Sequence, residues 1–142
     1  MTRASLAVLC ALALLLVGCA HRLTPAIHVL NTTSAALSAS HAAIVNVQDA
    51  ESAQAEARCS TRECAEAAGA AVDVQYDPWW DAYHAGWLSW VAARSVVEAS
   101  QAVDAAGGTY DATRVSAAVL AIAAAQERLR AATEGLMQRR QR

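Results

Sequence analysis

Three residues in the middle of the chain, Asp77, Asp81 and His84, have side chains that could form an acid–base group. Two carboxylates and an imidazole can transfer protons, but covalent hydrolysis also needs a nucleophile, and none accompanies them. Helix formation explains the same residues, with Asp77 as an N-cap and Asp81 in a first turn, where the helix dipole favours a carboxylate. We therefore assign no catalytic residue, no metal and no cofactor, and we expect that the protein is not an enzyme.

Aromatic side chains occupy the same stretch at helical spacing. Trp80, Tyr83, Trp87 and Trp90 are three or four residues apart, so on a helix they would share one face, with His84 beside them. These rings could fill the core of a protein that has no Phe, or they could form a ligand pocket or a partner surface. We expect core packing and keep the five residues as the candidate ligand or partner face.

The N-terminal segment indicates a different chemistry. Arg3 precedes an apolar run from Leu6 to Val17, which ends in Gly18 and Cys19. A basic residue, a short apolar run and a small residue are typical of a secretory signal. With a leucine three positions before the cysteine, the end of this segment resembles the lipobox of bacterial lipoproteins. The resemblance implies that residues 1–18 are a cleaved signal peptide and that Cys19 carries diacylglycerol and a fatty acyl chain such as palmitate.

The lipobox resemblance also implies a location. Ala20 stands where enterobacterial lipoproteins of the inner membrane usually have Asp, so the resemblance implies an outer-membrane lipoprotein. We expect it to face the periplasm, with exposure at the cell surface as the alternative. Acyl chains buried at about 0.8 kcal/mol per methylene would hold it on the membrane. Two alternatives remain. An uncleaved membrane anchor from Ala4 to about Ala20 is slightly shorter than the roughly 20 residues needed to span a bilayer, and a plain signal peptide could be cut at another small residue.

Charge and composition argue against two kinds of partner. All 11 basic residues are arginine; without Arg3, ten remain against 13 acidic residues, so the net charge is near −3. A negative balance gives no electrostatic basis for binding nucleic acid. The major murein lipoproteins are joined to peptidoglycan through a C-terminal lysine, and this chain contains no lysine. We expect instead a protein partner in the envelope.

Cys59 and Cys64 remain as a pair once Cys19 is lipidated, and we expect a disulfide in an oxidising envelope. No other Cys or His lies nearby at the spacing of zinc ligands, so a metal site is disfavoured. Five residues apart on one helix, the two side chains would point about 140° away from each other, so a turn must separate them. Ser60 and Glu63 fit a capping box that starts a new helix at this turn.

Heptad spacing predicts two of the helices. The first begins at Thr24-Pro25 and reaches about Arg58. Its large row is Leu30, Leu37 and Ile44, and its smaller row is Ala26, Thr33, Ser40 and Val47. The last helix begins after Thr109 or Asp111; its large row is Val115, Ile122, Leu129 and Leu136, and its small row is Ala118, Ala125 and Ala132. Small residues at alternate seam positions allow neighbouring helices to approach closely.

The region between them is predicted to be helical but discontinuous. It starts at Thr61, meets Gly69, and is interrupted at Asp77-Pro78, because proline lacks the amide donor and disfavours helical geometry in the residue before it. Its second part runs to about Ala106, where two glycines provide a C-terminal cap.

Together these patterns predict an all-α fold of three long antiparallel helices, a bundle resembling a coiled coil, whose second helix is kinked or broken near Pro78. The expected organisation is a signal peptide (1–18), a tether (19–24) and one helical domain (25–142). The expected function is that of a non-enzymatic, lipid-anchored envelope protein with a structural or protein-interaction role. The alternative is a small-ligand-binding helical bundle that uses the aromatic face.

Overall fold

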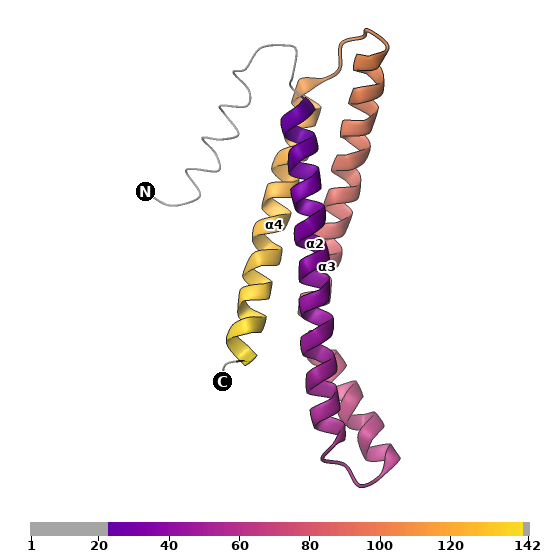
Figure 1. Cartoon of the computed structure of the whole chain (residues 1–142), viewed down its shortest axis with the longest axis vertical. Coiled ribbons are helices and arrows are strands. Elements are labelled where there is room, and N and C mark those ends of the chain that lie inside the picture. Colours follow the sequence, from indigo (N-terminus) through magenta and orange to yellow (C-terminus); the bar gives the residue numbers. More distant parts are fainter. Residues whose placement is uncertain (1–22, 141–142) are drawn as a thin grey trace, which may run out of the picture. The chain divides into compact units, whose positions relative to one another are not determined.

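The computed structural model describes residues 23–140, which form three α-helices (Figure 1). These are α2 (Leu23–Glu56), α3 (Arg62–Ala105) and α4 (Ala112–Arg140), and the described residues include no strand. The helices pack against one another, which confirms the predicted all-α bundle. The predicted signal peptide, Cys19 and the first residues of the tether lie outside the described residues.

The three helices form two compact units along the chain. Unit 1 contains residues 23–34 and 89–124, which are the start of α2, the end of α3 and the start of α4. Unit 2 contains the described residues 35–88 and 125–140, which are the end of α2, the start of α3 and the end of α4. In each unit, therefore, α3 runs antiparallel to both other helices.

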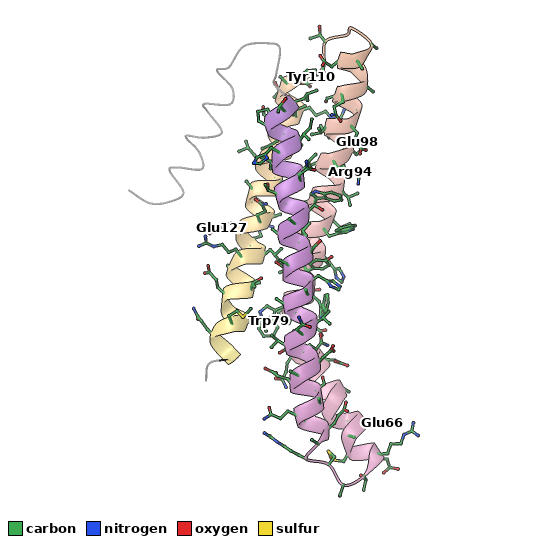
Figure 2. The ribbon with its side chains drawn as sticks, viewed as in Figure 1. Glu66, Trp79, Arg94, Glu98, Tyr110 and Glu127 are labelled. Carbon is green, nitrogen blue, oxygen red and sulfur yellow. A yellow bond between two sulfur atoms is a disulfide. The ribbon has the colours of Figure 1, made fainter. Side chains whose placement is uncertain are left out.

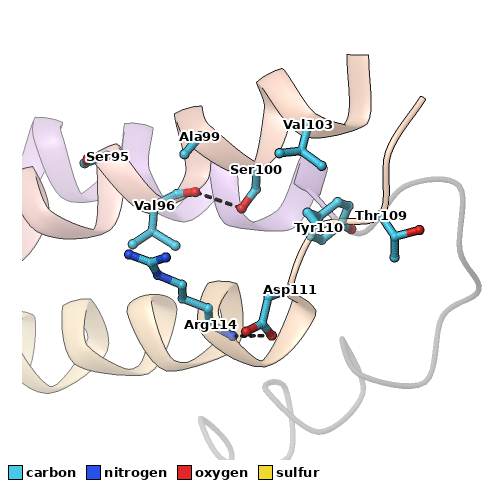
Figure 3. A pocket seen from close by; sticks show the side chains of 9 residues that line it. All are labelled: Ser95, Val96, Ala99, Ser100, Val103, Thr109, Tyr110, Asp111 and Arg114. Atoms are coloured by element: carbon cyan, nitrogen blue, oxygen red, sulfur yellow. Dashed lines mark hydrogen bonds between the residues drawn. The ribbon is translucent and has the colours of Figure 1, made fainter. Parts of the chain in front are cut away.

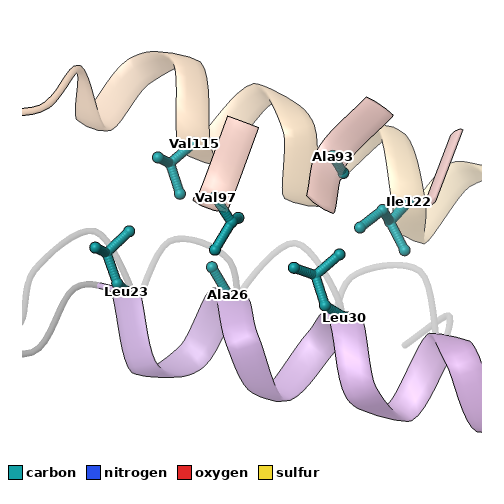
Figure 4. Packing of buried hydrophobic residues seen from close by; sticks show 7 residues of the cluster. All are labelled: Leu23, Ala26, Leu30, Ala93, Val97, Val115 and Ile122. Atoms are coloured by element: carbon teal, nitrogen blue, oxygen red, sulfur yellow. The ribbon is translucent and has the colours of Figure 1, made fainter. Parts of the chain in front are cut away.

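Unit 1 has its own apolar core, to which all three helices contribute (Figure 4). The buried residues are Leu23, Ala26 and Leu30 of α2, Ala93 and Val97 of α3, and Val115 and Ile122 of α4. The Trp90 and Tyr110 rings are half-buried against this cluster. Burial of such side chains stabilises a fold by roughly 1.5–3 kcal/mol each.

Unit 2 is built around a larger aromatic side chain. Tyr76 is fully buried and packs with Ile44, Val47, Val72 and Leu136. Three further rings, those of Trp79, Trp80 and Tyr83, are half-buried against this cluster.

The predicted heptad rows of α2 and α4 are confirmed. All four members of the large row in α4 are buried, as are Leu30, Leu37 and Ile44 in α2. Thr33, in the smaller row of α2, is also buried, and its hydroxyl donates to the backbone carbonyl of Val29 over 2.6 Å. A buried hydroxyl with such a partner avoids the cost of an unsatisfied polar group.

The buried side of α3 differs from the predicted aromatic face by about one position. From Val72 onwards, nine of its buried and half-buried residues form a heptad pattern of their own: Val72, Tyr76, Trp79, Tyr83, Gly86, Trp90, Ala93, Val97 and Ser100. Here too, large residues of one row alternate with small residues of the other, at Gly86, Ala93 and Ser100. Trp87, which we expected in the core, is 43% exposed, so that prediction is wrong.

Of the predicted kink or break near Pro78, the break is wrong, because α3 is one continuous helix through both Gly69 and Pro78. Pro78 cannot donate a hydrogen bond to the carbonyl of Val74. Both residues are exposed, so water can hydrate that carbonyl, while Tyr76 and Trp79 keep the helix packed on its other side.

The first turn of α3 is capped one residue later than predicted. The Thr61 hydroxyl accepts a hydrogen bond from the backbone N–H of Cys64 over 3.3 Å, so Thr61, rather than Ser60, is the N-cap. Glu63 is consequently too early in the helix to complete the predicted capping box.

The end of α3 follows the prediction. Gly107 has a φ of 75°, and its N–H donates to the carbonyl of Asp104 over 2.9 Å. The N–H of Gly108 donates to the carbonyl of Val103, also over 2.9 Å. These two bonds make a Schellman motif, in which glycine is favoured because the C′ residue has positive φ.

The start of α4 agrees with one of the two predicted caps. Asp111 accepts hydrogen bonds from the backbone N–H groups of Thr113 and Arg114 over 2.9 and 3.1 Å. It is therefore the N-cap of α4, and Thr109 lies before it.

Candidate functional site

Four rings from two helices gather in unit 2, and we call them the ring cluster: His41 of α2 with Trp80, Tyr83 and His84 of α3. Their spacing on α3 explains the arrangement, because residues three and four apart are neighbours on a helix surface. His41 comes from the neighbouring helix. Sequence spacing alone does not select His41, although it lies three residues before the buried Ile44 and thus close to the seam.

The rings of this cluster contact one another mainly through edges. The His41 ring centroid lies 5.4 Å from that of Trp80 and 5.3 Å from that of Tyr83, with interplanar angles of 71° and 61°. The Trp80 and Tyr83 centroids are 5.9 Å apart at 89°. Edge-to-face contacts of this kind add about 0.5–1.5 kcal/mol beyond area burial. The cluster is therefore a fixed element of the surface.

Hydrogen bonds fix the two tryptophans at positions 79 and 80. The Trp80 indole N–H donates to Oε1 of Gln48 over 2.8 Å, and Nε2 of Gln48 donates to Asp73 over 2.8 Å. The Trp79 indole N–H donates to the carbonyl of Ala132 on α4 over 2.9 Å (Figure 2). Both rings are thereby held against neighbouring helices.

Next to the ring cluster, α3 exposes large apolar side chains. Trp87 is 43% exposed and Leu88 is 67% exposed. His84, also exposed, precedes them by three and four residues, so the three side chains share one side of the helix. We call His84, Trp87 and Leu88 the exposed α3 face.

The remaining member of the predicted face, Trp90, belongs to unit 1. Its indole N–H donates to the carbonyl of Leu30 over 2.9 Å, and the Arg94 guanidinium carbon lies 5.4 Å from its ring centroid. Arg94 also pairs with Glu98 over 2.6 Å on the surface of α3 (Figure 2). Of the five predicted residues, the structure thus brings Trp80 and Tyr83 together with His84.

In the possible acid–base group of Asp77, Asp81 and His84, neither aspartate lies at the start of a helix as predicted. Because α3 continues through Pro78, Asp77 is an exposed residue inside the helix and not an N-cap, and Asp81 lies one turn further along. His84 packs against the rings of Trp80 and Tyr83. Within residues 23–140, no group of three or more metal-ligating side chains was found.

The predicted disulfide joins Cys59 and Cys64, whose Cα atoms are 5.5 Å apart. It closes the turn between α2 and α3, as required by two cysteines five residues apart. Cys19, the predicted lipidation site, lies outside the described residues.

Of the helices in the described part, none has both the length and the apolar character needed to cross a membrane. Searches of protein-family models, curated proteins and solved structures found no match to this chain.

Proposed function

We propose that this chain is a non-enzymatic lipoprotein of the bacterial outer membrane, anchored through Cys19, that binds a protein partner in the envelope through the exposed α3 face. The lipobox at Leu16 to Cys19 supports the anchor. The exposure of Trp87 and Leu88 carries the proposal for the partner surface.

Large apolar side chains side by side on a surface are typical of interaction sites. Tryptophan is enriched among the residues that dominate binding energy. Its side chain buries a large apolar area on binding, and few rotatable bonds have to become fixed. Here Trp87 and Leu88 are adjacent on α3, close in sequence to the ring cluster.

The ring cluster supports a surface better than a ligand pocket. Its rings pack on one another's edges, and the Trp80 indole N–H is used by Gln48. A small-molecule site would need an enclosed space lined by such groups. We therefore favour the protein-binding function over the ligand-binding alternative.

The experiment is site-specific photo-crosslinking in the native cell, with the photoreactive residue at Leu88. Val74 is the matched control, because it is on the same helix, is also aliphatic and is equally exposed, at 68% against 67%. We expect a discrete crosslinked species from position 88 and none from position 74. Equal crosslinking at both positions, or none at either, would contradict the proposed surface.

A further inference from the structure

A pocket of about 240 Å³ lies in unit 1, between the end of α3 and the start of α4 (Figure 3). Val96 and Val103 of α3 and the ring of Tyr110 supply apolar lining, and Ser95 adds a hydroxyl. Its charged lining comes from Asp111 and Arg114 of α4, which carry opposite charges.

These two charges do not form an ion pair with each other. Both described hydrogen bonds to Asp111 end on Oδ1, which leaves Oδ2 for another donor. The Arg114 side chain extends towards Val96 (Figure 3), and among the described residues neither charge takes part in an ion pair. Arg114 lies in the first turn of α4, where the helix dipole disfavours a cation, so its position does not follow from helix stability.

A pocket with one guanidinium and one carboxylate matches a ligand that carries both charges. The anionic group of such a ligand would accept charge-assisted hydrogen bonds from Arg114, and its ammonium group would donate to Asp111. Asp111 and Arg114 are both exposed, so water competes for each contact, and a ligand that engages both charges is favoured over one that engages only one of them.

The pocket lies close to the residue that begins α2. Leu23 shares a buried cluster with Val97 and Val115, and Tyr110 packs against the same cluster (Figure 4). Cys19 precedes Leu23 by four residues, which span at most about 14 Å when fully extended. If Cys19 is lipidated, as the proposed function holds, this end of unit 1 lies at the membrane surface.

We infer that this pocket binds the zwitterionic phosphoethanolamine headgroup of a membrane phospholipid. Arg114 contacts the phosphate and Asp111 contacts the ammonium group, while Val103 and Tyr110 pack against the carbon atoms between the charges. The inference rests on the proposed lipid anchor for the source of the ligand, and the contacts orient unit 1 on the membrane.

The test uses residues 19–142 with Cys19→Ser, a chain without lipid that contains every described residue. Glycerophosphoethanolamine, a water-soluble headgroup, is titrated while the NMR signals of the Tyr110 amide and Arg114 Nε are followed. We expect saturable shifts in the millimolar range. Arg114→Gln and Asp111→Asn should each weaken binding at least tenfold; the asparagine can still cap α4. Arg128→Gln, which changes an exposed arginine of α4 outside the pocket, should bind as the parent chain does.

Three results would overturn the inference: no saturable shift, equally tight binding of glycerol phosphate, which lacks the ammonium group, or equally tight binding of glycine, which would assign the pocket to a free amino acid. Because this chain carries no lipid, the titration does not depend on anchoring. Failure of the proposed lipid anchor would appear in a separate experiment, in which protein that carries no lipid is still found in the membrane fraction.

Discussion

Replacing Gly86 by alanine tests how closely the three helices of unit 2 approach one another. A Cβ at position 86 would lie 3.3 Å from Cδ2 of Leu37 and 3.8 Å from Cδ2 of Leu129. Both leucines are buried, at 2% and 4% exposure, so neither methyl group can move into solvent. Gly135 of α4 provides the matched control, since a Cβ there meets nothing within 4 Å.

The expected change in the free energy of unfolding differs between the two substitutions. Alanine inside a helix is favoured over glycine by about 0.8–1 kcal/mol. At Gly135 nothing opposes this gain, so Gly135→Ala should stabilise by about that amount. At Gly86 the added methyl must displace packed side chains, which costs about 1–3 kcal/mol. We therefore expect Gly86→Ala to be between neutral and about 2 kcal/mol destabilising.

Urea unfolding followed by circular dichroism, on residues 19–142 with Cys19→Ser, measures the free energy of unfolding of both variants. The two should differ by about 1–3 kcal/mol. If Gly86→Ala stabilises the protein as much as Gly135→Ala does, the close approach of α2, α3 and α4 at this position is refuted.

Three further predictions follow from burial and chemistry. Tyr76→Ala should lower the free energy of unfolding by about 3–5 kcal/mol because Tyr76 is fully buried. Trp87→Ala should lower it by no more than about half of that, since 43% of Trp87 is already exposed. Urea unfolding compares the two variants, and equal losses would contradict the exposed position of Trp87. Peptide mapping without reduction should recover Cys59 linked to Cys64, and replacing both by serine should cost only about 1–2 kcal/mol because the loop is short; free thiols at both positions in exported protein would contradict the bond. Cys19→Ser should abolish labelling with a fatty acid and release the protein from membranes, and a variant that stays in the membrane pellet would show that the apolar segment itself is the anchor.

The sequence predicts α2 and α4 well because their large apolar residues repeat every seven positions and no second face of either helix carries a comparable row. Leu30, Leu37 and Ile44 are buried where the pattern places them, and the same holds for Ile122 and Leu129 in α4. A row of aliphatic side chains at heptad spacing has one face that can be buried, so the pattern determines the orientation of the helix.

The orientation of α3 is harder to predict because aromatic residues lie on two sides of it. Trp87 is large and apolar and dominates any estimate of the buried face, yet Gly86 next to it occupies the seam. A glycine in the seam becomes understandable only when the neighbouring leucines are seen. The same large and small alternation that α2 and α4 show would have indicated Gly86, Ala93 and Ser100 as the small row.

The continuity of α3 at Pro78 also depends on tertiary packing. Proline removes one hydrogen bond inside a helix, which costs about 3 kcal/mol when nothing offsets it. Here Tyr76 and Trp79 anchor the helix to the core of unit 2 on either side of Pro78. The ring cluster was only partly predictable for a similar reason, because His41 joins it from another helix.

Oxidative footprinting of Trp87 tests most directly whether a partner covers the exposed α3 face. Met137 is an internal reference in the same protein, because its side chain is readily oxidised and its exposure, 41%, is close to the 43% of Trp87. The ratio of Trp87 to Met137 oxidation is measured by mass spectrometry in the purified protein and in native cell envelopes. The proposed function predicts a ratio at least several-fold lower in the envelope, where the partner covers Trp87. An unchanged ratio would contradict it.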